Sequence, residues 1–426
     1  MKLSKLALTR NKILQEDKTF AQELLLKSGQ LYQFCSGVYG YDNVLYLVMK
    51  KVKDVISKHL SKADCVEVNL PILQPESLWI ESQRLQKYLD EQLIYQVNRD
   101  NQRYVLGPTA EETMVDFLRA RLTSYKMLPT TFFQIQTKFR DEIRSRGYLI
   151  RGKVFEMLDA YSFARNEAEM KQDYERMKKV YFDIFDELGL QILPVGAESG
   201  SMGGKKSEEF MILTEIGEDV VYYDEKTNKA FNQELLERED AEEYLKENYG
   251  ITEPKNMKQY KALEAGHNFE LGTFYSDRMK IYFVDENGQN APYYMGCYGI
   301  GVSRVTAVIY EKSKLVNDKG EFIGFSLPYN LAPYKVQIIY SNNEQKQKDA
   351  ESLYEKLQKA DINSLIDDRN DIMFGARIKD ANLLGTPYVA VFGNKTEDGQ
   401  VEIENTKTKE KQFLTIDQAV EFFKSL

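Results

Sequence analysis

The chain has 426 residues, a formal net charge of −9, three cysteines and two histidines. Its length predicts two domains rather than one core. The negative charge argues against non-specific nucleic-acid binding as the main role, but it allows a local basic groove that fits one folded RNA. Cysteines without CxxC spacing and so few histidines argue against a disulfide framework and against zinc. No apolar run approaches the ~20 residues of a membrane helix and no secretory signal is evident, so we expect a cytoplasmic protein with no membrane partner.

The N-terminal half predicts helices around one long hairpin. Apolar residues at helix spacing predict mostly helix over residues 1–60, and alternation predicts a strand over 65–71. An amphipathic helix is expected over 109–124. Two alternating runs between residues 132 and 159, joined by a short basic loop, predict a long antiparallel hairpin. A helix over 166–188 follows.

The middle of the chain is expected to contain a charged surface segment. Residues 225–262 are rich in glutamate and predict a solvated helical insertion rather than core. Strands are expected to resume at 269–284 and 292–298, and a helix at 303–312. Residues 326–333 have the composition of a linker.

From residue 334 onward, strand and helix alternate. The last helix opens with Thr415 and Gln418 in the positions of a capping box. Alternating β and α elements predict a small α/β domain with a mixed sheet over 334–426, so the whole chain falls in the α/β (α+β) class. The expected elements are strands at 335–340, 363–367 and 387–392, helices at 345–359 and 375–384, a charged hairpin at 399–413 and the final helix.

The long hairpin carries the strongest functional signal. A period of two places one set of polar side chains on a single face of the hairpin. Unpaired buried charge is costly, so this face is either a solvated amphipathic surface or the holder of a polar ligand. The set consists of Gln134, Gln136, Lys138, Arg140 and Glu142.

Three further strings are candidates for chemistry, and each has a plainer alternative. The string MGCYGIGVSR at 295–304 lies between a predicted strand and a predicted helix. Glycines there let backbone and cation approach a triphosphate, although glycines also mark tight turns. The string GPTAEE at 107–112 fits a capping box from Thr109 to Glu112. The string GHNFELGT at 266–273 contains a histidine that a structural role would also explain.

Together these strings resemble a known family. FRDE at 139–142, followed by Arg151, Phe155 and Asp159, is similar to motif 2 of class II aminoacyl-tRNA synthetases. The string at 295–304 is similar to motif 3, and its MGCYGIG portion points to the prolyl members. Further segments look like the same family over nearly the whole chain, at 37–39, 67–75, 124–129, 159–163, 200–204, 217–219, 367–369 and 385–388.

The resemblance implies a prolyl-tRNA synthetase of the bacterial or organellar type. That fold is an antiparallel-sheet catalytic domain, expected here at 1–325, a linker at 326–333 and a small α/β anticodon-binding domain at 334–426. In bacterial relatives an editing domain lies between motifs 2 and 3. Here only the charged stretch 225–262 occupies that space, so we expect no cis hydrolysis of mischarged tRNA.

The resemblance also implies substrates and site residues. L-proline and ATP would be joined as prolyl-adenylate, with Mg²⁺ as cofactor. Arg140 and Arg304 are the expected catalytic residues, with Arg140 on the α-phosphate and substrate carboxylate and Arg304 on the γ-phosphate. The expected proline-binding residues are Thr109, Glu111, Arg140, His267, Phe269 and Cys297. The expected ATP-binding residues are Arg140, Glu142, Arg151, Phe155, Glu270, Thr273, Gly299, Gly301 and Arg304. Glu270 is also the expected Mg²⁺ ligand.

The remaining expected partners are tRNA(Pro) and a second copy of the chain. Arg144 and Arg146 in the hairpin loop, and Arg369 and Lys379 near the C-terminus, are candidates for contacts with tRNA from their position and charge. The homodimer is implied by the resemblance alone.

Several positions depart from the family pattern. Lys153 and Val154 stand where Arg-Glu is usual, Leu158 stands where lysine is usual, and Glu208 stands where histidine is common. These departures keep two alternatives open. One is a paralogue that adenylates an imino acid for another acceptor, and the other is a non-catalytic regulatory binder.

Overall fold

The computed structural model describes residues 1–6, 19–197 and 206–426. The family-like segment at 200–204 lies outside the described residues. The chain divides into two compact units, which we name the central unit and the terminal unit. The central unit comprises Ser36–Val38 and Lys53–Val305, and the terminal unit comprises Met1–Cys35, Tyr39–Val52 and Thr306–Leu426.

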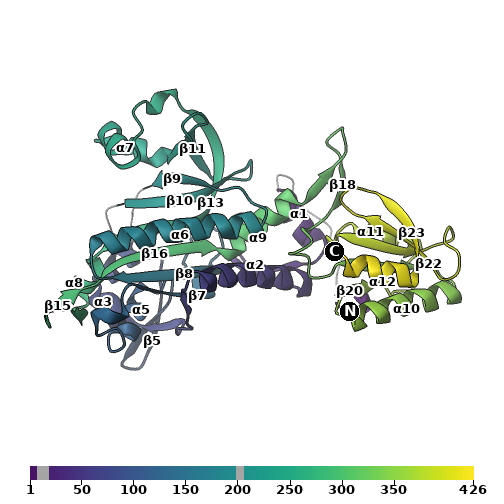
Figure 1. Ribbon diagram of the computed structural model, residues 1–426, viewed down its shortest axis with the longest axis horizontal. Coiled ribbons are helices and arrows are strands. Elements are labelled where there is room, and N and C mark those ends of the chain that lie inside the picture. Colours follow the sequence, from purple (N-terminus) through teal and green to yellow (C-terminus); the bar gives the residue numbers. More distant parts are fainter. Residues whose placement is uncertain (7–18, 198–205) are drawn as a thin grey trace. The chain divides into compact units, whose positions relative to one another are not determined.

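A nine-stranded sheet forms the body of the central unit (Figure 1). Its strands pair antiparallel except at two places, where β3 pairs with β7 and β12 pairs with β9 in parallel. The order across the sheet is β10 (Lys206–Leu213), β9 (Leu193–Ala197), β12 (Lys229–Asn232), β11 (Asp219–Asp224), β13 (Lys258–Gly272), β16 (Tyr294–Gly301), β8 (Val154–Ala164), β7 (Thr130–Phe139) and β3 (Val66–Glu67).

The predicted long hairpin is confirmed as β7 and β8. Its register places Gln134 opposite Asp159 and Lys138 opposite Phe155. In β8 the side chains alternate between the two faces of the sheet, so Asp159 and Tyr161 share one face while Leu158 and Ala160 share the other. The hairpin therefore brings polar residues from both strands to the same face.

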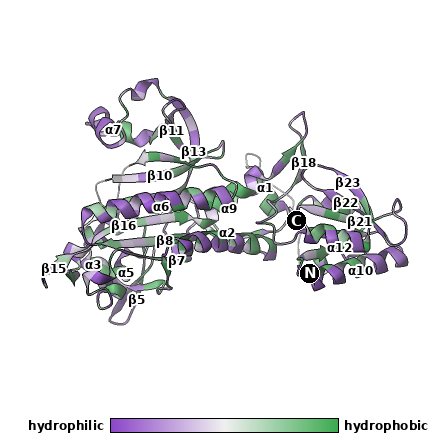
Figure 2. Ribbon diagram, in the orientation of Figure 1, coloured by the Kyte–Doolittle hydropathy of each residue, from purple (hydrophilic) through white to green (hydrophobic). Residues whose placement is uncertain are grey.

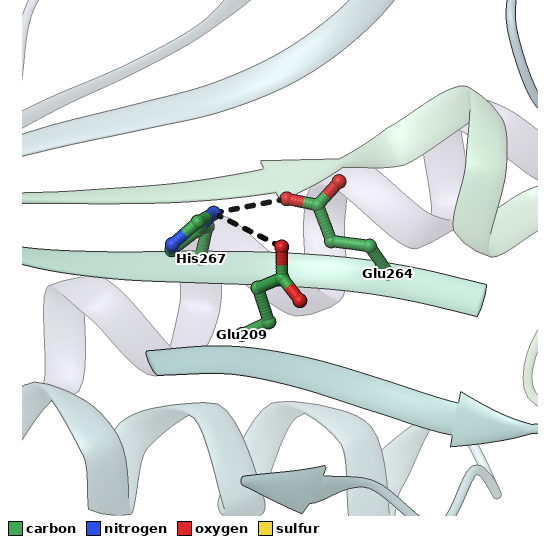
Figure 3. A group of neighbouring side chains, drawn as sticks. All are labelled: Glu209, Glu264 and His267. Atoms are coloured by element: carbon green, nitrogen blue, oxygen red, sulfur yellow. Dashed lines mark hydrogen bonds and ion pairs between the residues drawn. The ribbon is translucent and has the colours of Figure 1, made fainter. Parts of the chain in front are cut away.

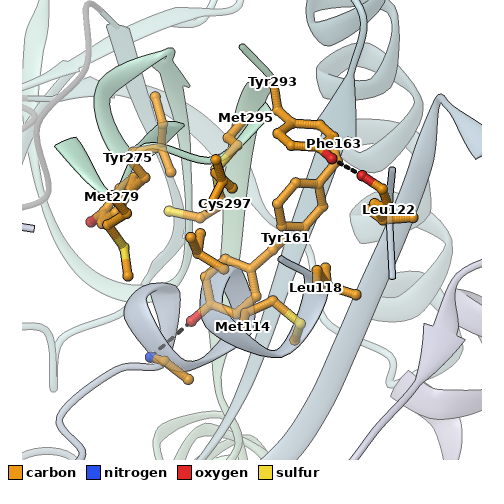
Figure 4. Close-up of a cluster of buried hydrophobic side chains, with 14 of the residues drawn as sticks. Met114, Leu118, Leu122, Tyr161, Phe163, Tyr275, Met279, Tyr293, Met295 and Cys297 are labelled. Carbon is orange, nitrogen blue, oxygen red and sulfur yellow. Dashed lines mark hydrogen bonds between the residues drawn. The ribbon is translucent and has the colours of Figure 1, made fainter. Parts of the chain in front are cut away.

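Each face of the sheet is covered by a different layer. The predicted helix at 166–188 is α6 (Glu167–Glu187), which begins after the N-cap Asn166 and packs on β8, β13 and β16. Figure 2 shows hydrophobic and hydrophilic residues mixed along α6, as expected for a helix with one buried face. The other face carries an apolar cluster that includes Met114, Tyr161, Tyr275 and Cys297 (Figure 4).

Smaller elements complete the central unit. Two further sheets are β4 (Leu73–Pro75), β6 (Gln102–Leu106) and β5 (Tyr95–Arg99), and β14 (Tyr282–Val284) with β15 (Asn290–Pro292). Its other helices are α3 (Glu76–Glu81), α4 (Leu85–Asp90), α5 (Glu111–Leu118), α7 (Ala241–Tyr249) and α8 (Phe274–Arg278), with 3-10 turns at Tyr125–Met127, Gln233–Glu237 and Pro254–Asn256. Two helices contribute residues to both units, α2 (Asn43–Lys62) and α9 (Val302–Lys312).

The terminal unit contains the mixed sheet predicted from residue 334 onward. Strands β20, β19 and β21 are parallel, and β22 and β23 continue the sheet antiparallel. The predicted capping box is present, because Thr415 and Gln418 bond to each other's backbone at the start of α12. The bounds are β19 (Val336–Tyr340), α10 (Glu344–Lys359), β20 (Ser364–Ile366), α11 (Phe374–Ala381), β21 (Tyr388–Phe392), β22 (Gln400–Asn405), β23 (Lys411–Thr415) and α12 (Ile416–Lys424). The remaining elements are a 3-10 turn at Leu3–Lys5, α1 (Phe20–Lys27), β1 (Leu31–Cys35), β2 (Val38–Tyr41), β17 (Lys314–Val316) and β18 (Phe322–Phe325).

Two expectations about the first third of the chain are wrong. Residues 31–41 form the β1–β2 hairpin rather than helix, and β1 is exposed at every position after Leu31, so no inside–outside alternation marked it as a strand. The strand expected over 65–71 shrinks to β3. No described helix is both long and apolar enough to cross a membrane.

The expected capping box at Thr109 is also wrong. The N-cap of α5 is Ala110, whose side chain cannot cap, and the helix ends at Leu118 rather than near residue 124. The Thr109 hydroxyl donates instead to Glu111 at 2.6 Å. The carboxylate of Glu112 accepts from Ser82 at 2.8 Å. Both acidic residues are therefore committed to tertiary contacts rather than to the helix start.

The charged stretch 225–262 is only partly the helical surface segment expected. It includes β12 and the start of β13, which belong to the main sheet, and only α7 is a full helix. Phe231, Leu235, Leu245 and Ile251 form a buried cluster there. The sequence did not reveal this small core, because its apolar residues are widely spaced among many charged residues.

Candidate active site

A cavity of about 300 Å³ opens on the β7–β8 face of the central sheet. Arg140 at the end of β7 and Arg304 in α9 both line it, although 164 positions separate them in sequence. Most of the predicted site residues meet there. Those that line the cavity are Thr109, Glu111, Arg140, Glu142, Arg151, Phe155, His267, Phe269, Cys297, Gly299, Gly301 and Arg304.

A fully buried polar group, which we name the buried cluster, forms one part of the wall and the layer directly behind it. It consists of Arg84, Thr109, Glu111, Glu112 and Tyr161, each no more than 2% exposed. Arg84 Nη1 donates to Glu112 Oε1 at 2.9 Å and lies 3.3 Å from Glu111 Oε2. The Tyr161 hydroxyl accepts from the Ala110 N–H at 2.9 Å. These contacts fix the Glu111 carboxylate at the cavity wall.

A buried ion pair supports this cluster from the sheet. Lys138 Nζ lies 2.8 Å from Asp159 Oδ1, and Gln134 Nε2 donates to Asp159 Oδ2 at 2.9 Å. The Tyr161 hydroxyl donates to the same oxygen at 3.0 Å. Burial raises the pKa of Asp159, and the charge of Lys138 opposes that shift. The polar face expected from the sequence is therefore buried at Gln134 and Lys138, where pairing offsets the loss of water.

The apolar part of the wall adjoins Glu111. The rings of His267 and Phe269 stack with centroids 3.9 Å apart. Cys297 lies at the base of the cavity, where burial and the neighbouring Glu111 raise the pKa of its thiol well above the usual value. A neutral thiol beside two rings gives a small apolar pocket next to a carboxylate.

Arg140 differs from the other cavity arginines. Its guanidinium lies 5.3 Å from the centroid of the Phe155 ring. None of the acidic side chains in the described residues forms an ion pair with it. Arg140 therefore has its planar donors available for an anion in the cavity.

The other two arginines form what we name the paired-arginine cluster, which consists of Glu142, Arg151, Glu218, Glu264 and Arg304. Arg304 Nη1 donates to Glu264 Oε2 at 2.6 Å, and its Nε donates to the Ile150 carbonyl at 3.1 Å. Arg151 Nε donates to Glu218 Oε2 at 3.0 Å, and its Nη1 lies 3.5 Å from Glu142. Burial raises the pKa of Glu264, but Arg304 and His267 outweigh it, so the net shift is downward.

Glu209, Glu264 and His267 come together from β10 and β13 (Figure 3). One ligand atom from each lies within 4.8 Å of the others. Burial, and next the charge of Glu264, raises the pKa of Glu209 well above its usual value. Two adjacent carboxylates that repel each other when both are ionised offer oxygen ligands, which suit a hard divalent cation such as Mg²⁺.

Six predicted residues do not line the cavity. Glu270 follows Phe269 in β13 and so faces the opposite side of the sheet, and the Thr273 hydroxyl donates to Asp277 at 2.7 Å before α8. Arg146 pairs with Glu218, while Arg144 is exposed. In the terminal unit, Arg369 is held by Asp367 at 2.7 Å and Asp380 at 3.1 Å, whereas Lys379 is exposed on α11. Their assigned roles stay predictions.

Sequence reasoning missed several residues that shape the cavity. Glu264 is the β13 carboxylate that lines it, and Arg84 and Glu209 lie directly behind the wall. No signal in the sequence marked Arg84. The positive φ of 62° at the preceding Gln83, which marks a constrained turn, is visible only in the fold.

Two of the departures from the family pattern lie away from the cavity. Leu158 faces the α6 side of the sheet and is fully buried. Glu208 accepts from the Tyr174 hydroxyl at 3.0 Å and from Lys178, both on α6. Lys153 instead contacts the hairpin, where its Nζ donates to Asp141 at 2.6 Å. These substitutions leave the cavity-lining residues in place.

Comparison with known proteins agrees with the motifs. Residues 95–313 match the family model described as the tRNA synthetase class II core domain (G, H, P, S and T), and residues 335–426 match an anticodon binding domain. The chain is 35% identical over 411 residues to the proline–tRNA ligase of Rickettsia bellii, covering 93% of each chain. It is 37% identical over 404 residues to that of Sulfurimonas denitrificans, covering 92% of this chain and 91% of the relative.

A solved structure shares the fold. The prolyl-tRNA synthetase of Cryptosporidium parvum, crystallised with halofuginone and AMPPNP, superimposes with a TM-score of 0.70 at 17% identity, covering 95% of this chain and 78% of that chain. The fold class and the resemblance inferred from the motifs are both confirmed. The chain belongs to the proline–tRNA ligase family of class II tRNA synthetases.

Proposed function

We propose that the chain is a ligase that activates L-proline with ATP and transfers the prolyl group to the 3′ end of tRNA(Pro). The observation that carries the proposal is that Arg140, Arg304 and Glu111 line one cavity. An arginine with no ion pair among the described residues, an arginine paired with Glu264 and a buried carboxylate are the groups needed to hold a carboxylate, a triphosphate and an ammonium together.

The first step joins the two small substrates. The proline carboxylate attacks the α-phosphorus of ATP, which forms the acyl-phosphate bond of prolyl-adenylate and breaks the bond to pyrophosphate. Arg140 binds the carboxylate and α-phosphate and holds them in line. Its charge also stabilises the negative charge that develops on the phosphate oxygens. Phe155 and Glu142 suit the adenine, by stacking and by accepting from its amino group.

Binding of proline uses the opposite part of the wall. Glu111 accepts from the secondary ammonium, and Thr109 holds Glu111 in place through the 2.6 Å hydrogen bond. The stacked rings of His267 and Phe269 and the neutral Cys297 enclose the apolar pyrrolidine ring. No residue needs to form a covalent intermediate.

Magnesium is part of the proposal. One carboxylate oxygen of Glu209 and one of Glu264 lie within 4.8 Å of each other, whereas Glu270 faces the other side of the sheet. This supports Glu209 and Glu264, rather than Glu270, as the Mg²⁺ ligands. A bound divalent cation would neutralise the charge of the β- and γ-phosphates. Arg304 contacts Glu264 directly and so remains beside the same phosphates.

The second step transfers the prolyl group. A ribose hydroxyl of the terminal adenosine attacks the acyl carbon of prolyl-adenylate, which forms the ester and releases AMP. We propose that Arg144 and Arg146 face the acceptor end, and that residues 334–426 read the anticodon after a catalytic domain at 1–325 and a linker at 326–333. Lys379 is a better candidate for an RNA contact than Arg369, because Arg369 is already held by two aspartates.

We also propose a cytoplasmic homodimer without cis editing. Support for the dimer comes from β3, the edge strand of the central sheet, where Val66 is 46% exposed. Exposed edges of large sheets are normally covered. The absence of cis editing is supported by the stretch 225–262, which contributes β12 and the start of β13 to the main sheet and contains α7.

The test is proline-dependent ATP–pyrophosphate exchange followed by charging of tRNA(Pro). Exchange and charging are both expected. Exchange without charging would favour the paralogue that uses another acceptor, and loss of both would favour a regulatory binder. Sedimentation at micromolar concentration tests the dimer, and a monomer there would contradict it.

A further inference from the structure

Arg84 lies directly behind the cavity wall. It follows α3 and is 2% exposed, and neither it nor Glu112 is among the cavity-lining residues. Its Nη1 contacts Glu112 at 2.9 Å and Glu111 at 3.3 Å, so one guanidinium bridges two consecutive carboxylates. Only Glu111 of these three residues reaches the cavity.

Aromatic rings enclose the guanidinium. Its Cζ lies 5.3 Å from the centroid of Trp79, 4.7 Å from Tyr88 and 5.4 Å from Tyr275. Such a cage favours a flat, weakly hydrated cation over a lysine ammonium. The cage also restricts Arg84 to the position between the two carboxylates.

The charges of this group do not balance. Glu111 and Glu112 carry two negative charges, and Arg84 carries one positive charge. Asp159 is balanced separately by Lys138. Burial raises the pKa of Glu112, and Arg84 and Ser82, which both donate to its Oε1, oppose that shift by favouring the ionised form. One negative charge therefore remains at Glu111, in a place where burial makes an uncompensated charge costly.

We propose that Arg84 is a positioning residue for the amino-acid substrate: it cancels the charge of Glu112 and holds Glu111, so that one negative charge is left at the cavity wall for a secondary ammonium. The inference rests on the proposed function, because it assumes that proline binds at Glu111. Glu112 acts as the counter-charge that keeps Arg84 from neutralising Glu111.

The proposal predicts an unusual order of effects. In Glu112→Gln, Arg84 loses its nearer partner and pairs with Glu111, which removes the charge that the ammonium needs. The KM for proline should rise about tenfold to a hundredfold, while the KM for ATP stays the same. In the double variant Arg84→Met/Glu112→Gln, Glu111 is again an uncompensated carboxylate. Its KM for proline should be about tenfold lower than that of Glu112→Gln, with a lower kcat because Glu111 is held less firmly.

The experiment is steady-state pyrophosphate exchange with varied proline and varied ATP, on the full chain. Arg119→Met is the matched control, since Arg119 also lies beside α5 but is exposed and paired with Glu81 at 2.8 Å. Circular dichroism checks that each variant is folded, and the double variant keeps the net charge of the cluster, so it tests the idea even if Arg84→Met alone does not fold.

Two results would overturn the inference. One is an unchanged KM for proline in Glu112→Gln. The other is a double variant that binds proline no better than Glu112→Gln, because a purely structural Arg84 would make the second substitution neutral or harmful. Failure of the unmodified chain to exchange pyrophosphate with proline would contradict the proposed function instead, so the two failures are distinguishable.

Discussion

The buried cluster and the paired-arginine cluster both contribute residues to the cavity wall, but they differ in how their charges are paired and in how far they are exposed to water. The five side chains of the buried cluster are almost fully withdrawn from water, and one of them is Glu111, the carboxylate whose charge we propose is left uncancelled. In the paired-arginine cluster, Arg151 and Arg304 keep 35% and 21% of their side chains exposed, and each already contacts a carboxylate of the chain. The buried cluster can therefore bind a cationic group. In the paired-arginine cluster, an anion that binds must first displace the carboxylates that contact the arginines.

This difference teaches how one cavity accepts a small zwitterion and a large polyanion. Desolvated groups give strong and specific contacts, because an unpaired buried charge is costly. Ion pairs that keep some contact with water are less costly to break than fully buried ones, so phosphates can displace Glu218 and Glu264 more easily than a ligand could break the buried cluster. Specificity is therefore expected from the buried cluster and nucleotide affinity from the paired-arginine cluster.

The largest effect is expected at Arg140, which lines the cavity. Arg140→Gln should lower the kcat of pyrophosphate exchange about 10²- to 10³-fold, because one fixed cationic donor to the developing charge is lost. Arg103→Gln, at an exposed arginine of β6, is the control. A near-normal kcat in Arg140→Gln would contradict the proposal that Arg140 binds both the carboxylate and the α-phosphate.

Removing the charge of the buried cluster comes next. Glu111→Gln should raise the KM for proline about tenfold to a hundredfold, the value of one charged hydrogen bond, and leave the KM for ATP unchanged. Asp116→Asn, at an exposed position of the same helix, should change neither constant. A parallel rise of both KM values would contradict the division of labour between the clusters.

A smaller effect is expected in the paired-arginine cluster. Arg304→Gln should raise the KM for ATP about tenfold, because a partly exposed cation contributes less than a fully buried one. The KM for proline should stay within error of that of the unmodified chain. Equal loss of proline binding would mean that the two clusters are energetically coupled.

The smallest effect concerns a partly buried carboxylate that forms no ion pair with a described residue. Asp42 precedes α2, its Oδ1 accepts from the Leu45 N–H at 2.9 Å, and burial raises its pKa to about 7. A raised pKa means that the folded chain holds this proton more tightly than the unfolded chain, so stability falls as pH rises from about 4 to 7. Asp42→Asn keeps the acceptor and removes the charge.

Urea unfolding at two pH values measures the Asp42 effect. At pH 8 the variant should be more stable than the unmodified chain by on the order of 1 kcal/mol, after allowance for solvent screening. At pH 4 the two should be equal, because Asp42 is then neutral in the fold. A gain at pH 4 as large as at pH 8 would exclude titration of Asp42 as its cause.

The motifs predicted the family and most of the cavity wall for a physical reason. Phosphate and carboxylate recognition needs particular residue types at fixed spacing within a motif, so Arg140 and Phe155 on the β7–β8 hairpin and Arg304 in α9 were identified from the motifs that resemble the family. Alternation likewise revealed the β7–β8 hairpin, and αβ alternation revealed the terminal sheet. The role of Glu270 was predicted only from the resemblance of the string at 266–273 to the family. In β13 the Glu270 side chain faces α6 instead of the cavity.

The sequence by itself determined the fold class, through local periodicity, and, through its resemblance to the class II synthetases, the two arginines and the acidic residue that line one cavity. Only the tertiary structure decided which charges cancel. Arg84, Glu112 and Glu209 act through partners at distant positions or on neighbouring strands, and Thr109 bonds to Glu111 rather than capping α5. Net charge inside a cavity is a sum over neighbours in space, and no local pattern records that sum.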